Sequence, residues 1–77
     1  MIREHDRVIL TSDLPHDRLK AGDVGTVVHV HPRRRAYELE FVTLDGRTAV
    51  VVTAVPTQIR PIGRRDIAHA RRLERVS

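Results

Sequence analysis

Short runs of alternating apolar and polar residues occupy most of the first 62 positions, with turn-forming residues between them. A period of two places successive side chains on opposite faces of a strand, and the β-branched residues of these runs suit a pleated sheet. No helical period appears before residue 64. The pattern predicts an all-β fold, a small five-stranded barrel, with strands over residues 6–11, 24–31, 36–43, 48–53 and 58–62.

The stretch from residue 19 to residue 28 organises this pattern, because a polar loop becomes an apolar run there. Gly22-Asp23 predicts a turn, since glycine tolerates a positive φ and aspartate bonds its own backbone. Gly25 lies just inside the strand that follows, which indicates a bulge or a close approach of the backbone to a neighbour. The stretch therefore predicts a strand that bends around a small barrel.

Single residues also predict the later turns and strand ends. Asp45-Gly46 is a strong hairpin signal between the third and fourth strands. Pro56 breaks the fourth strand and is expected to open one turn of 3₁₀ helix. Pro61 has no N–H to donate, so it is expected on an edge strand or at the end of a strand.

The register of the hairpin between the second and third strands follows from its side chains. A loop of four residues, 32–35, sets His31 opposite Ala36. The inner face is then nearly all apolar and the outer face mostly polar, and a slip of one residue would mix the two sets. The expected inner pairs are Val30–Tyr37, Val28–Leu39 and Thr26–Phe41, and the expected outer pairs are His29–Glu38 and Val27–Glu40.

Two segments lie outside the strand pattern. Residues 12–20 form a long polar loop, in which Leu14 and Leu19 are expected to cover one end of the barrel, and loops of this length tend to carry recognition. Residues 63–77 form an Arg-rich arm after a barrel that spans residues 1–62. Ile67, Ala70, Leu73 and Val76 recur at every third position and give a thin apolar stripe. A helix this short is marginal in water, so the arm is expected to be a short helix or an extended segment docked on a protein surface.

Composition narrows the class of protein. The chain has 77 residues, which makes one small domain, and it has no cysteine. Disulfides and thiolate metal sites are therefore excluded, and a domain without such staples suits a reducing cytoplasm. The charged first six residues do not resemble a signal peptide, and no apolar run approaches the length of a membrane helix, so no membrane association is expected.

The net charge of +4 is unevenly distributed. Residues 1–63 carry nine basic and eight acidic side chains, whereas residues 64–77 carry five arginines against Asp66 and Glu74. A second basic cluster, Arg33-Arg34-Arg35, lies at the predicted hairpin tip. The barrel body is thus close to neutral, which weakens the case for a nucleic-acid surface on the barrel itself.

Candidates for intrinsic chemistry are few. No serine has an expected histidine neighbour, so no activated nucleophile is predicted. Glu38 and Glu40 share one face of a strand, where solvated carboxylates are the expectation rather than acid–base catalysis. His29 and His31 also share a face and would bind zinc or nickel only if further ligands converged, with Glu38, His5 and His16 as the candidates. We expect no catalytic residue, no metal and no cofactor.

Strand one, the long loop, Lys20-Ala21-Gly22-Asp23-Val24-Gly25-Thr26-Val27 and Val55-Pro56-Thr57-Gln58-Ile59-Arg60-Pro61 together resemble a family of short bacterial proteins of unknown function. That family is similar to the SH3-like barrels of KOW modules and of the nitrile hydratase β subunit. The resemblance covers residues 1–62 and implies an SH3-like barrel. It brings no catalytic residues, and it implies small accessory or partner proteins, some of them in toxin–antitoxin-like pairs.

The expected function is therefore binding rather than catalysis. The first hypothesis is a protein-binding module that contacts its partner protein through Leu14, Leu19, Ile67 and Leu73. The alternative is a nucleic-acid contact module that uses basic side chains of the hairpin tip and the arm, namely Arg33, Arg34, Arg35, Arg64, Arg65, Arg71, Arg72 and Arg75. KOW-type barrels often contact RNA, but only Tyr37 and Phe41 are available for base stacking, and the expected register buries both. A third alternative is a subunit or chaperone of a metalloenzyme.

Overall fold

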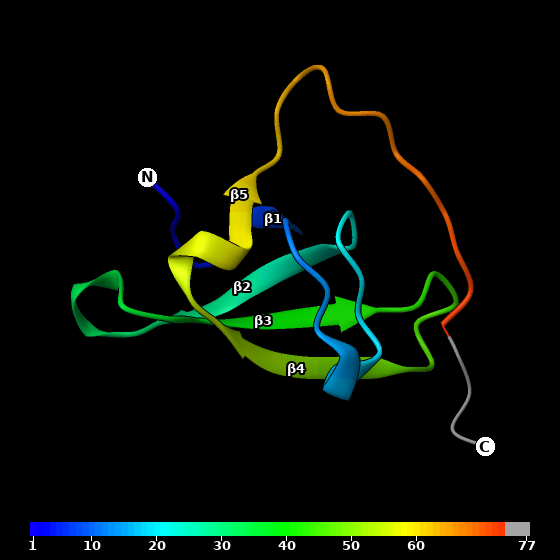
Figure 1. The fold of residues 1–77 in the computed structure, drawn as a ribbon, viewed down its shortest axis with the longest axis horizontal. Coiled ribbons are helices and arrows are strands. Elements are labelled where there is room, and N and C mark those ends of the chain that lie inside the picture. Colours follow the sequence, from blue (N-terminus) through cyan, green and yellow to red (C-terminus); the bar gives the residue numbers. More distant parts are fainter. Residues whose placement is uncertain (74–77) are drawn as a thin grey trace.

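Five antiparallel strands form one curved sheet in the computed structural model, which describes residues 1–73 (Figure 1). The all-β fold predicted from the alternation is confirmed, and the order across the sheet is β4-β3-β2-β1-β5. The strands are β1 (Arg7–Leu10), β2 (Val24–Val30), β3 (Tyr37–Val42), β4 (Ala49–Ala54) and β5 (Ile59–Pro61). Single 3₁₀ turns interrupt the connections at η1 (Pro15–Asp17), η2 (Pro32–Arg34) and η3 (Pro56–Gln58).

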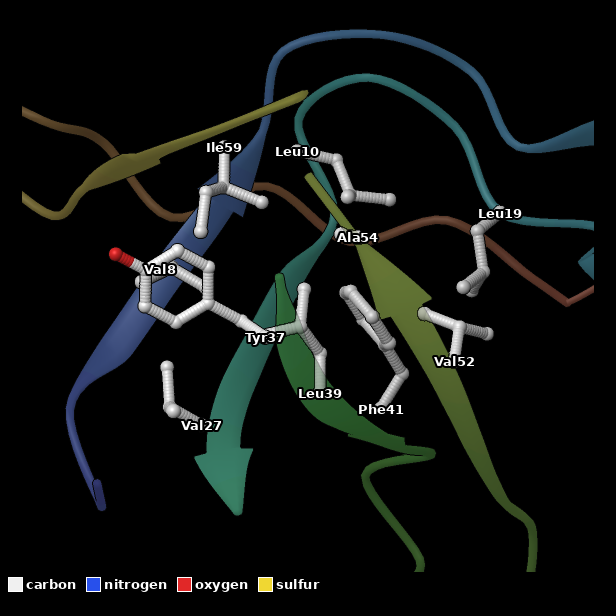
Figure 2. Close-up of a cluster of buried hydrophobic side chains, with 10 residues drawn as sticks. All are labelled: Val8, Leu10, Leu19, Val27, Tyr37, Leu39, Phe41, Val52, Ala54 and Ile59. Atoms are coloured by element: carbon white, nitrogen blue, oxygen red, sulfur yellow. The ribbon is translucent and has the colours of Figure 1, made fainter. Parts of the chain in front are cut away.

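The core lies on the concave side of this barrel-like sheet, and every strand contributes to it (Figure 2). Val8 and Leu10 of β1 are fully buried, as are Val27 and Leu39 at the centre. Leu19 comes from the long loop and packs against the same cluster. The complete cluster consists of Val8, Leu10, Leu19, Val27, Tyr37, Leu39, Phe41, Val52, Ala54 and Ile59.

The β2–β3 hairpin has the predicted register only near its loop. The His31 N–H donates to the Ala36 carbonyl over 3.0 Å, and Val30 pairs with Tyr37. A β-bulge then falls between Val27 and His29, and Val28 is the extra residue.

The bulge overturns the rest of the predicted register. Val27 faces Leu39 and is buried, whereas Val28 is 42% exposed, so the expected Val28–Leu39 pair is wrong. Thr26 faces Glu40 rather than Phe41. The physical reason is that β2 pairs with β1 through its first residues and with β3 through its later ones. A β-bulge increases the bend of a strand, and β2 needs this bend in order to pair with both β1 and β3.

Gly25 marks a close approach of the backbone to a neighbouring side chain, which was one of the two possibilities that the sequence left open. It pairs with Val8 of β1, and a Cβ atom built on it would lie 2.8 Å from Cε1 and Cζ of the Phe41 ring. The Phe41 ring therefore occupies the space that any side chain at this position would need. Gly22 has a φ of +96°, as the predicted turn requires.

The remaining turns also follow their sequence signals. Asp45 and Gly46 lie in a four-residue loop closed by the Thr43 N–H, which donates to the Thr48 carbonyl over 2.9 Å. The Asp45 carboxylate accepts the Thr43 hydroxyl at 2.7 Å, and together with the Arg47 backbone N–H this holds the pKa of Asp45 below its usual value. Pro56 begins η3, as predicted.

The arm after Gly63 is extended and has no helix over its described part, residues 63–73. Ile67 and Ala70 of the apolar stripe are both exposed and do not pack on the barrel, and Val76 lies outside the described residues. Only Leu73 is half-buried. The stripe therefore does not dock the arm on its own barrel, and docking on a foreign protein stays a prediction; side-chain ion pairs, described next, hold the arm on the barrel instead.

Candidate partner-binding surface

The first anchor of the arm is an ion pair between Arg60 of β5 and Asp66. The Arg60 Nη2 atom lies 2.7 Å from Asp66 Oδ1, and Nη1 lies 3.0 Å from Oδ2. The Gly63 N–H also donates to Oδ2 over 2.6 Å. The Arg60 guanidinium and this backbone N–H lower the pKa of Asp66 to about 2, and Asp66 in turn raises the pKa of Arg60. A planar two-point pair of this kind sets the direction in which the chain leaves β5.

The second anchor joins the arm to the glycine-aspartate turn before β2. Arg71 donates from Nε to Asp23 Oδ1 over 2.9 Å and from Nη2 to Oδ2 over 2.5 Å. Its Nη2 atom also donates to the Arg18 carbonyl over 3.0 Å. Partial burial would raise the pKa of Asp23, but the hydrogen bonds from Arg71 and from the Lys20 backbone N–H outweigh it and lower the pKa. The arm is therefore fixed to the barrel at a point 48 residues away in the chain.

Residues 62–70, which follow β5 and precede Arg71, form a segment that we call the arch, and Asp66 of the first anchor lies within it (Figure 1). Ile67 lies near its middle with 92% of its surface exposed. Arg64 and Arg65 precede it, are exposed, and make no ion pair within residues 1–73. The arch thus presents one aliphatic side chain beside two cations, on a segment tied down at both ends.

The structure separates the four residues predicted to contact a partner protein. Leu19, one of the predicted partner contacts, is buried in the core, so its side chain does not reach the surface. Leu14 is half-buried against the same core and forms an isolated bridge with Leu19, so the two leucines close the end of the barrel as expected. Leu73 is half-buried, and Ile67 alone of the four is fully presented to solvent.

The arginines of the nucleic-acid alternative are not brought together. Arg33, Arg34 and Arg35 are exposed at the β2–β3 tip, and the first two have positive φ angles of 59° and 54°. Figure 1 shows this tip at the opposite end of the molecule from the last described residues of the arm. Arg71 is held by Asp23, and Arg75 lies outside the described residues.

The histidine and glutamate side chains on the outer sheet face form pairs instead of a cluster. His31 Nε2 lies 2.6 Å from Glu38 Oε2, and Thr53 donates to both Glu38 oxygens over 2.8 Å. These hydrogen bonds, that of His31 first, lower the pKa of Glu38. His29 is the backbone neighbour of Glu38, as predicted, but its ring lies 3.9 Å from Glu4. Within residues 1–73 no three histidine or acidic side chains group as metal ligands would.

Sequence reasoning missed both anchors of the arch. The only local signal for the Arg60–Asp66 pair was the opposite charge of two residues six positions apart. The Arg71–Asp23 pair had none, since the two residues are far apart in the chain and several other arginines precede and follow Arg71.

Comparison with known proteins places the chain in a family. Residues 4–61 match the family described as domain of unknown function DUF4926, and the chain belongs to that family. The match covers the sheet and ends before the arch. No curated protein and no solved structure matches the chain. Within residues 1–73 there is no helix of the length and apolar character that spanning a bilayer requires.

Proposed function

We propose that this protein is a non-enzymatic, cytoplasmic SH3-like barrel that binds another protein through the arch. The observation that carries the proposal is the exposure of Ile67, 92% of its surface, on a segment anchored at both ends. An isolated exposed aliphatic residue is common, but this one is held in position by two bidentate ion pairs. A segment ordered before binding loses less conformational entropy in the complex.

The chemistry of the arch defines the surface it fits. A branched aliphatic side chain fills a small apolar pocket, and arginines at the rim of an interface pair with carboxylates. The partner surface would therefore offer an apolar pocket beside acidic side chains that face Arg64 and Arg65. An accessory or antitoxin-like role, which the family resemblance implies, fits a small domain with one presented anchor.

Nucleic-acid binding is the second candidate, and the exposed cluster Arg33–Arg35 favours it. Phosphate contacts from the tip would add salt-dependent affinity. The alternative is weaker because the tip and the last described residues of the arm lie far apart (Figure 1). Both aromatic side chains that stacking would use, Tyr37 and Phe41, are buried.

The test is a pull-down from lysate of the source organism, with and without nuclease, followed by calorimetry on the captured protein. Ile67→Asp should weaken binding at least about tenfold, because it places a charge in an apolar pocket. Leu44→Asp is the matched control, since Leu44 is an equally exposed aliphatic residue, 98% exposed, that lies in the β3–β4 loop and not in the arch.

Capture that disappears with nuclease would refute the proposal in favour of nucleic acid. Equal loss of affinity in the Ile67 and Leu44 variants would also contradict it. A titration against duplex DNA and RNA at two salt concentrations measures the alternative directly, because each neutralised phosphate steepens the salt dependence.

A further inference from the structure

β4 forms one border of the sheet and has none of the features that normally protect an edge strand (Figure 1). Residues 48–55 read Thr-Ala-Val-Val-Val-Thr-Ala-Val, without a charge or a proline. Its register with β3 runs through six consecutive pairs without a bulge. Uncharged, regular, apolar edges of this kind pair readily with another strand, and natural proteins usually block them with lysine, proline or a bulge.

The pairing pattern shows which backbone groups this edge presents. The Thr43 N–H donates to the Thr48 carbonyl, and hydrogen-bonded pairs recur at every second residue of an antiparallel ladder. The even-numbered residues from 48 to 54 therefore direct their backbone groups to β3. Ala49, Val51 and Thr53 direct their N–H and C=O groups away from the sheet. All three residues are exposed, and Val51 is 58% exposed.

No other described segment takes up these groups. Within residues 1–73, no backbone or side-chain hydrogen bond from outside β3 reaches the backbone of residues 49–53. The opposite border of the sheet differs, because β5 has only three residues and ends in Pro61, which has no N–H. The two edges thus contrast within one molecule, and β4 alone is long, regular and unprotected.

We propose that β4 pairs antiparallel with β4 of a second copy of this chain, about a two-fold axis that passes between their Val51 residues. Val51 then faces Val51 of the second copy, and Ala49 faces Thr53. The outward groups of the three residues match one another completely, because each facing pair exchanges two N–H···O bonds. All six outward groups of each edge are satisfied, and no like charges meet.

The side chains are also self-complementary. A cross-strand valine pair is favourable, and the alanine–threonine pairs that flank it are small and uncharged. β5 of a second copy is a poorer pairing partner, because Arg60 and Pro61 offer few backbone N–H groups to donate. This inference is independent of the arch, so a failure of either proposal leaves the other standing.

Single cysteines test the register, since the chain has no cysteine of its own. Val51→Cys places two thiols across the two-fold axis with Cα atoms about 5.5 Å apart, within the range of a disulfide. Ala49→Cys is the matched control on the same edge, because four residues of offset separate its two copies by roughly 13 Å. Mild oxidation should therefore cross-link the Val51 variant rapidly and the Ala49 variant at least about tenfold more slowly.

Sedimentation equilibrium of the unmodified chain completes the test. The chain should sediment as a concentration-dependent dimer, and Val51→Lys should shift it to monomer by placing two ammonium groups together. Val42→Lys, on the same outer face but on β3, should leave the dimer intact. A chain that stays monomeric at millimolar concentration, a dimer that survives Val51→Lys, or equal cross-linking at positions 49 and 51 would each overturn the proposal.

Discussion

Replacing Gly25 with alanine should destabilise the fold, although alanine normally stabilises a strand relative to glycine. The added Cβ atom would lie 2.8 Å from Cε1 and Cζ of Phe41 and 3.1 Å from Cε2. The Phe41 side chain is only 6% exposed, so the ring has little room to withdraw. The clash involves a packed core residue, and the backbone φ of Gly25 is not in the positive region, so steric overlap alone causes the effect.

The magnitude follows from two opposing effects. Forcing an extra methyl group into a packed core costs about 1–3 kcal/mol. Removing a glycine recovers about 0.4–1 kcal/mol by restricting the unfolded chain. The net loss in the free energy of unfolding is about 1–2 kcal/mol. A domain of this size is stable by about 4–12 kcal/mol, and Tm falls by roughly 4–8 °C for each kcal/mol lost.

Urea and thermal unfolding followed by far-UV circular dichroism measure this loss. Gly63→Ala is the control, because a Cβ atom there would meet only Asp66 Oδ2, at an ordinary contact distance of 3.5 Å. The decisive comparison adds Phe41→Leu, which removes the ring atoms in conflict. Gly25→Ala should cost at least about 0.5 kcal/mol less in that background. An equal cost in both backgrounds, or a Gly25→Ala melting point at or above that of the unmodified chain, would refute the steric argument.

Two further predictions concern the anchors of the arch. Asp66 has a pKa of about 2, below the ordinary value of about 3.9, so its ion pair contributes fully above pH 4 and is lost as the pH falls toward 2. Carboxyl NMR should show this low titration midpoint, and Arg60→Gln should raise it. An unchanged midpoint in that variant would contradict the pairing. Arg71→Ala should lower the free energy of unfolding by about 1–2 kcal/mol, because it leaves the half-buried Asp23 carboxylate without its charged donor. The exposed Arg72→Ala is the control for this measurement, and equal effects of the two substitutions would rule out the second anchor.

Much of the sheet was determined by local pattern. The alternation of side chains located all five strands to within one residue at each end. The turn at Gly22 and the 3₁₀ turn at Pro56 also followed from single residues. These features depend on backbone preferences of one or two residues, which a sequence displays directly.

The candidate binding surface was only partly predictable. Ile67 was predicted to be a contact residue, and the structure shows that its side chain is exposed on an arm without a helix. Leu19 was predicted both to cover the barrel end and to contact a partner, and its side chain is buried at the end of the core. Exposure depends on which other segments pack over a side chain, and that information is not local.

Tertiary structure alone decided the bulge at Val28 and the anchoring of the arm. A bulge shifts every later side chain by one position, so the same alternating sequence fits two registers until the neighbouring strands select one. The need of β2 to pair with both β1 and β3 made that selection here. Likewise, Arg71 is chosen from among several arginines because the folded chain brings it to Asp23, and an ion pair depends on distance in space rather than on spacing in the sequence.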